Sequence, residues 1–247
     1  MRNQIPPPLP SQRRDPFVFG PLPEGQSTVG AIEALLKEPG RIIYELQENW
    51  RANLSAWLLV FALLGIAGYG LVVGSFSGGQ QLWVAPVKLS IGTLLSVLIC
   101  LPSLYIFACL AGVETRLRTI AGVLFAAMAL TALLLIGFAP VAWIFSQATD
   151  SVAFMGALHL LLWAIAIGFG LRVIAATSRL LAGYNHGHMN LWSLIFILVC
   201  LQMMTTLRPI VATSNRFLPG EKKFFVAHWL ETMGKPNATK SDAPNPY

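Results

Sequence analysis

Five long apolar runs, separated by short polar gaps, dominate the hydrophobic pattern of this chain. Each run is between 18 and 29 residues long, and an α-helix needs about 20 apolar residues to cross roughly 30 Å of bilayer hydrocarbon. The pattern therefore predicts an all-α integral membrane protein, a bundle of about five transmembrane helices. Four spans with one re-entrant run is the alternative count. The predicted spans are residues 54–74, 84–112, 119–146, 152–177 and 190–207.

Amphipathic segments flank the predicted bundle on both sides. In residues 27–53, apolar side chains recur at helical spacing before and after a break at Pro39-Gly40. In residues 208–233, two aromatic residues and a methionine recur every four positions. Amphipathic helices beside a span usually lie in the headgroup plane, so we expect two interfacial helices. The polar, proline-rich segments 1–26 and 234–247 are expected to be disordered tails.

The distribution of Lys and Arg predicts the orientation. Six basic residues precede the first span, and the connection between the fourth and fifth spans, to which we assign Arg172 and Arg179, is also basic. Because basic flanks stay in the cytoplasm, the N-terminus is predicted to be cytoplasmic. Five spans then place the C-terminal tail outside, which conflicts with its six basic and three acidic residues. The sequence contains no recognisable export or retention signal, which favours a bacterial inner membrane.

Composition supports a membrane location and argues against nucleic-acid binding. Hydrophobic residues make up 55% of the chain and charged residues 11%, compared with about 25% charged residues in soluble domains. The net charge is +6, but the basic residues lie in tails and gaps rather than on one folded face. Anionic lipid headgroups are therefore the expected partners of this charge.

The spans lack the residues that most catalysis requires. No Asp or Glu lies inside a predicted span, and no nucleophile–base pair or metal-binding motif is recognisable. His186 and His188 form an H-x-H pattern that we assign to a solvated loop, because further metal ligands are not evident nearby. The three cysteines lie inside apolar runs without metal-site spacing. We therefore expect no enzymatic activity, no catalytic residues, no metal and no cofactor.

Two groups of residues remain as candidates for function. Polar residues within or at the end of apolar runs could contact lipid headgroups or line a cavity: Lys88, His159 and Arg208. The expected role of His159 is helix packing, with an ion path or a shared ligand site as the alternative. Small residues allow helices to approach closely, and the candidates for helix packing are Gly65, Gly68, Gly70, Gly74, Gly168 and Gly170.

The layout of the chain resembles that of the Yip1-like multi-pass membrane proteins. The resemblance covers roughly residues 28–210 and rests on the broken amphipathic lead-in KEPGRIIYEL, five hydrophobic segments and the scarcity of intramembrane charge. Gly68-Tyr69-Gly70 echoes the glycine-tyrosine usage of that family. The resemblance implies a non-enzymatic membrane organiser or adaptor that works through partners.

These features lead to three functional hypotheses. The first is a scaffold, adaptor or subunit of a larger membrane assembly, with membrane lipids, other membrane proteins or copies of this chain as partners. The alternative is a small channel or transporter for a neutral or lipid-like substrate, in which Lys88 and His159 would line a cavity. An enzyme that acts on a lipid comes third, because the sequence shows no catalytic set.

Overall fold

The structure, a computed structural model, places seven helices and no strand in the residues that it describes. Those residues are 19–22, 28–48, 52–113, 116–149, 151–182 and 186–206. The helices are α1 (Thr28–Lys37), α2 (Pro39–Gln47), α3 (Ala52–Ser77), α4 (Gln81–Leu110), α5 (Leu117–Ala148), α6 (Val152–Ala182) and α7 (His186–Thr206). Arg208, the predicted interfacial helix at 208–233 and both predicted tails, apart from Phe19–Leu22, lie outside the described residues.

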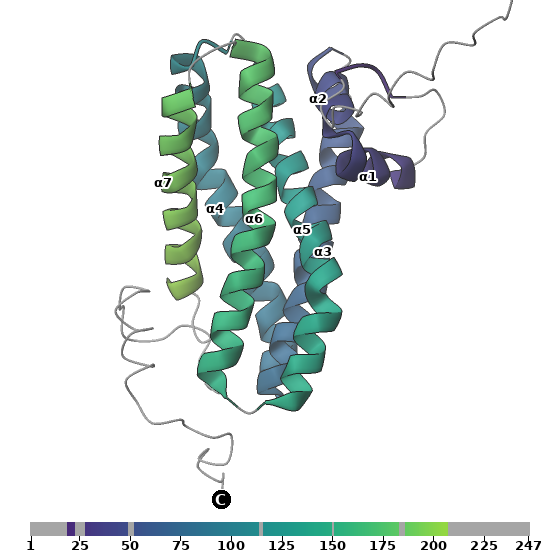
Figure 1. The fold of residues 1–247 in the computed structure, drawn as a ribbon, viewed down its shortest axis with the longest axis vertical. Coiled ribbons are helices and arrows are strands. Elements are labelled where there is room, and N and C mark those ends of the chain that lie inside the picture. Colours follow the sequence, from purple (N-terminus) through teal and green to yellow (C-terminus); the bar gives the residue numbers. More distant parts are fainter. Residues whose placement is uncertain are drawn as a thin grey trace, which may run out of the picture.

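Helices α3 to α7 form an elongated bundle, and α1 and α2 lie against one end of it (Figure 1). α3 packs against α4 and α5, α5 packs against α6, and α4 packs against α7. The central helix is α5, because 67% of its most apolar window is buried inside the protein, compared with 28–44% in α3, α4 and α6. Its buried positions include five alanines and one glycine, and such small side chains let neighbouring helices approach closely.

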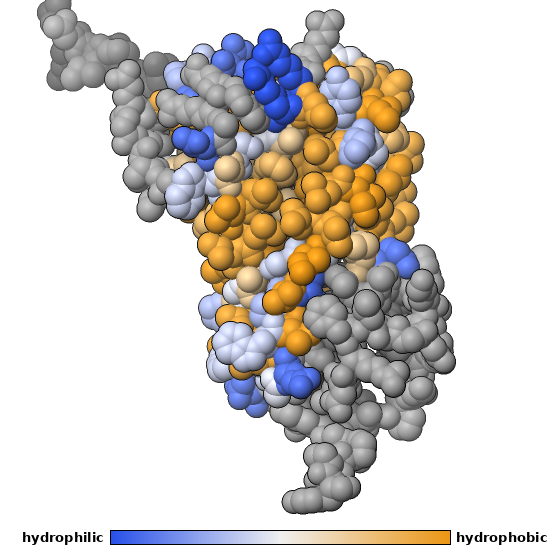
Figure 2. All heavy atoms as spheres, turned by 180° about the vertical axis from the view of Figure 1, so that it is seen from behind, coloured by the Kyte–Doolittle hydropathy of each residue, from blue (hydrophilic) through white to orange (hydrophobic). Residues whose placement is uncertain are grey.

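Four of these helices are long and apolar enough to cross a membrane. Their apolar segments are Asn53–Phe76, Leu82–Leu110, Leu117–Ala148 and Phe154–Arg179. Large apolar side chains cover their outer surfaces; Leu64, for example, is 68% exposed. Figure 2 shows these residues across the middle of one face, with hydrophilic residues gathered mainly toward its two ends. This surface is compatible with an integral membrane protein, because contact with lipid removes exposed apolar side chains from water.

The fifth predicted span is not among the four. α7 comprises 21 residues, but its apolar part is the shorter segment Asn190–Met203. In Figure 1, α7 begins near one end of the bundle and ends before the far end of α4. α7 is nevertheless packed: Trp192 is fully buried, stacks on Phe196 at 5.2 Å between ring centroids, and donates from Nε1 to Ser103 Oγ of α4 at 3.1 Å. A fifth membrane crossing therefore stays a prediction.

The amphipathic lead-in at residues 27–53 forms two helices, and the break between them lies at the predicted position, Pro39. α1 ends at Lys37 and α2 begins at Pro39, since proline fits the first turn of a helix but not its interior. The apolar face of α2 is buried against the bundle: Ile42, Ile43 and Leu46 have no exposed surface, and α2 contacts α5 and α6. Protein rather than lipid therefore covers this face, and a position in the headgroup plane is not needed to bury it.

Hydrogen bonds join the residues before α1 to α2, and an ion pair lies on the exposed side of α1. Arg41 donates to the carbonyl oxygen of Pro21 at 3.0 Å, and the backbone N–H of Leu22 donates to the Glu45 carboxylate at 3.2 Å. On α1, Lys37 Nζ donates to Glu33 Oε1 at 2.6 Å. The Lys37 ammonium holds the pKa of the Glu33 carboxyl below its usual range, but both side chains are solvated, so the pair adds little stability.

Candidate functional site

The two candidate polar residues that the structure describes lie buried near the same end of the bundle. Lys88 is the eighth residue of α4 and His159 is the eighth residue of α6. The α3–α4 and α5–α6 connections are at this end, so both residues lie about 10 Å from it at 1.5 Å per residue. Lys88 is 1% exposed and His159 is 7% exposed. Tyr69 of α3 is buried at a similar depth.

Tyr69 and His159 form a buried hydrogen bond between α3 and α6. The Tyr69 hydroxyl is 2.8 Å from His159 Nδ1, and the rings meet edge to face with centroids 5.6 Å apart. Within the described residues, His159 Nε2 has no hydrogen-bond partner, and neither has Trp163 Nε1 one turn further along α6. An unpartnered buried polar group costs about 1–3 kcal/mol, so the hydrogen bond that His159 does make matters for stability.

Lys88 and Trp163 line a small cavity between α4, α6 and α7. The cavity has about 10 Å³ open to the centre of a water-sized molecule, which is about what one water requires. The nearby hydroxyls of Thr93 and Ser96 donate to backbone carbonyls of their own helix, at 2.8 Å each. The site can therefore hold a water or an ion of similar size. In this conformation it is too small for a lipid or a metabolite.

The described residues do not form a recognisable catalytic or metal-binding arrangement. They contain no group of three or more His, Cys, Asp or Glu side chains that could hold a metal ion. The H-x-H pattern is not in a loop, as we had assigned it, because His186 and His188 are the first and third residues of α7.

The candidate glycines divide into those at helix contacts and those on the outer surface. A Cβ at Gly65 would lie 3.0 Å from Ala132 of α5, and a Cβ at Gly70 would lie 2.6 Å from the Pro86 Cα of α4. Gly170 lies against α5, at Thr131 and Ala127, and Gly74 is buried in α3.

Gly68 and Gly168 are exposed, with nothing within 4 Å of an added Cβ. These two glycines therefore do not contact another of the described helices.

A further contact glycine was missed in the sequence. Gly122 of α5 faces Leu46 of α2, whose Cδ2 would lie 2.9 Å from an added Cβ. The signal was present, because Gly122 and Ala126 form a small-xxx-small pair.

The nature of the neighbouring atoms predicts an order of sensitivity between two contact glycines. We expect Gly170→Ala to reduce the free energy of unfolding by about 1 kcal/mol more than Gly122→Ala. At Gly170 the new Cβ meets the Ala127 backbone oxygen at 2.8 Å, whereas at Gly122 it meets only the end of the Leu46 side chain. Thermal unfolding of the purified variants in lipid nanodiscs measures the difference. Equal midpoints, or the reverse order, would contradict the close approach of α5 and α6.

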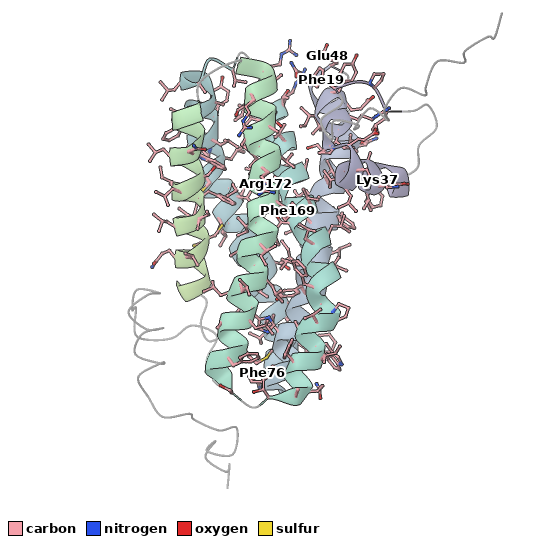
Figure 3. The ribbon with its side chains drawn as sticks, in the orientation of Figure 1. Phe19, Lys37, Glu48, Phe76, Phe169 and Arg172 are labelled. Atoms are coloured by element: carbon pink, nitrogen blue, oxygen red, sulfur yellow. The ribbon has the colours of Figure 1, made fainter. Side chains whose placement is uncertain are left out.

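Arg172 does not lie in a connection, as the sequence suggested, but inside α6. The helix continues to Ala182, ten residues beyond it. The side chain is exposed, and its guanidinium carbon is 5.1 Å from the centroid of the Phe169 ring. Figure 3 shows both residues in the upper half of α6. A cation on the outer surface of an apolar helix was not among the sequence candidates, because Arg172 was counted with the following connection although it lies inside the predicted span 152–177.

Comparison with known proteins adds no family to these observations. No protein-family model, no curated protein and no solved structure matches the chain.

Proposed function

We propose that this chain is a non-enzymatic integral membrane protein that acts as a subunit, adaptor or scaffold of a larger membrane assembly. Its N-terminus would be cytoplasmic, in a bacterial inner membrane, with α7 as a short fifth span. The Yip1-like layout, a broken amphipathic lead-in before a set of apolar helices, is consistent with such a role. The observation that carries the proposal is the position of Arg172.

Arg172 lies at a depth where lipid alone is a poor environment. The apolar segment of α6 is Phe154–Arg179, and Arg172 is about five residues, or about 8 Å, from its midpoint. Half of the hydrocarbon core measures about 15 Å, so a bilayer centred on the midpoint of this segment would place the residue within the hydrocarbon. An arginine at mid-membrane costs about 2.5–3.5 kcal/mol even on the lowest scales. Contact with another membrane protein would remove this cost, which is the expected situation for a subunit.

The test is to extract the full chain gently into native-lipid nanodiscs and to identify by mass spectrometry everything that co-purifies in stoichiometric amount. We expect one or more other membrane proteins at a fixed ratio to the chain. Recovery of the chain alone, or with a single tightly held lipid or solute, would count against the subunit role.

A small channel or carrier is the second candidate, and the buried polar residues favour it. Lys88 and His159 sit on different helices at the same depth, and Lys88 faces a cavity. A wider conformation of that cavity would be required, because the present one accommodates about one water. Under this hypothesis Lys88→Met abolishes solute flux in reconstituted vesicles while the fold survives. Under the subunit hypothesis there is no flux to lose.

A further inference from the structure

The exposed residues of α6 lie on one side of the helix, and we name the six of them between Leu161 and Arg172 the α6 face. At 100° per residue they fall within a single arc of the helix, with Gly168 and Arg172 near its centre. Gly168 has nothing within 4 Å of an added Cβ among the described residues, so none of the seven described helices covers it. The α6 face consists of Leu161, Ala164, Ile165, Gly168, Phe169 and Arg172.

The side chain of Arg172 is directed toward the middle of the bilayer rather than toward the nearer end of α6. Side chains on an α-helix lean toward its N-terminus, and the Arg172 guanidinium lies over Phe169, three residues toward that end (Figure 3). Extension toward the headgroups beyond Arg179 would require the opposite direction. Lipid phosphates lie outside the hydrocarbon, so this geometry favours a partner within the membrane over a phosphate.

Charge complementarity narrows the choice of partner. An arginine at this depth is best matched by a carboxylate, which it can bind through two parallel hydrogen bonds. Helices α3 to α7 contain no Asp or Glu, so the bundle of a second copy of this chain has none to offer. A carboxylate within the membrane-spanning part of the assembly would therefore come from a different protein.

The shape of the α6 face suits a helix as the occupant. Ala164 and Gly168 are four residues apart and both are exposed, and small residues at this spacing let the backbone of a second helix approach closely. Arg172 follows four residues later on the same line. A partner helix that packs along Ala164 and Gly168 would thus place a side chain from near the middle of that partner helix beside the Arg172 guanidinium.

We propose that the α6 face binds a transmembrane helix of another protein, and that an Asp or Glu of that helix pairs with Arg172. This inference rests on the proposed subunit function and specifies the chemistry of the partner.

The experiment places a photo-crosslinking amino acid at Ala164 of the full chain in its native membrane, with Arg172 intact or changed. With Arg172 present, we expect an adduct with a second membrane protein, in which the linked peptide is a transmembrane helix that carries Asp or Glu. Arg172→Leu should lower the adduct yield at least about tenfold, and Arg172→Lys should lower it less. The matched control, Arg179→Leu, changes an exposed arginine on the same side of α6 but two turns nearer the helix end, where headgroups rather than a partner carboxylate would meet it, and should leave the yield unchanged. Size-exclusion profiles and thermal midpoints of all variants check that the bundle is folded.

A reciprocal exchange of the two charges tests whether Arg172 pairs with the carboxylate of the partner. Arg172→Asp should lose the adduct, and replacing the partner's carboxylate by Arg should restore it. Adducts only with phospholipid, only with a second copy of this chain, or equally strong with Arg172→Leu would each overturn the inference. If a stoichiometric partner co-purifies but links at another surface, the inference fails while the subunit function stands. If no partner co-purifies, both fail.

Discussion

Gly70→Leu is expected to prevent α3 and α4 from packing and to destabilise the bundle by at least about 3 kcal/mol, the upper end of the usual range for overpacking. The reason is the identity of the neighbouring atoms. A Cβ at Gly70 would lie 2.6 Å from the Cα and 3.0 Å from the nitrogen of Pro86. Backbone atoms cannot move aside as a side chain can, so α4 would have to shift as a whole. Ser90 Oγ, which donates to the Leu63 carbonyl of α3 at 3.3 Å, would lose its contact with it.

The matched control for this substitution is only two residues away. Gly68→Leu introduces the same side chain into the same helix, but nothing lies within 4 Å of a Cβ at Gly68, which is exposed. We expect it not to lower the free energy of unfolding, because the position is open and leucine favours a helix more than glycine does, by up to about 1 kcal/mol. Monomer yield after extraction, and the thermal midpoint in nanodiscs, compare the two variants. Equal losses at both positions would mean that α3 and α4 do not meet at Gly70.

The difference between Gly68 and Gly70 also shows why the packing could not be predicted from sequence. In a soluble helix, polar residues mark the exposed side and thereby reveal the buried one. In α3, exposed and buried positions are both apolar: Leu64 is 68% exposed while Ile66 is 1% exposed. The hydrophobic pattern therefore does not predict which side of such a helix faces the rest of the bundle. Helix length and position, in contrast, follow directly from the apolar runs, and four helices of spanning length result.

Two other features were missed because sequence shows which face is apolar but not what covers it. The apolar stripe of α2 predicts an interfacial helix but does not reveal that Ile42, Ile43 and Leu46 are buried by protein. Arg172 was assigned to a connection because charge normally interrupts a span. The partner proposed for Arg172 belongs to a different protein, so the sequence of this chain alone could not predict that contact. The pairing of Tyr69 with His159 joins residues 90 positions apart, and no local pattern encodes such a contact.

Tyr69→Phe is expected to lower the free energy of unfolding by about 1–3 kcal/mol, because both ring nitrogens of the buried His159 would then lack a partner among the described residues. The substitution preserves the ring and its edge-to-face contact with His159, so packing should change little. Tyr105→Phe is the control. Tyr105 also packs against the core, but its hydroxyl makes no hydrogen bond within the described residues, and its loss should cost less than about 0.5 kcal/mol. Thermal unfolding in nanodiscs measures both.

A double-mutant cycle then isolates the hydrogen bond from the packing. His159→Leu removes the imidazole and leaves the Tyr69 hydroxyl without this hydrogen bond, so it is also destabilising. Because the bond is already absent in either single variant, the double variant should lose less stability than the sum, by about 1 kcal/mol, within the range for interhelical hydrogen bonds in membranes. Strictly additive losses would show that the pair does not form. If instead Tyr69→Phe left stability intact and abolished solute flux, the hydrogen bond would belong to a transport path. That result would favour the carrier hypothesis over the subunit hypothesis.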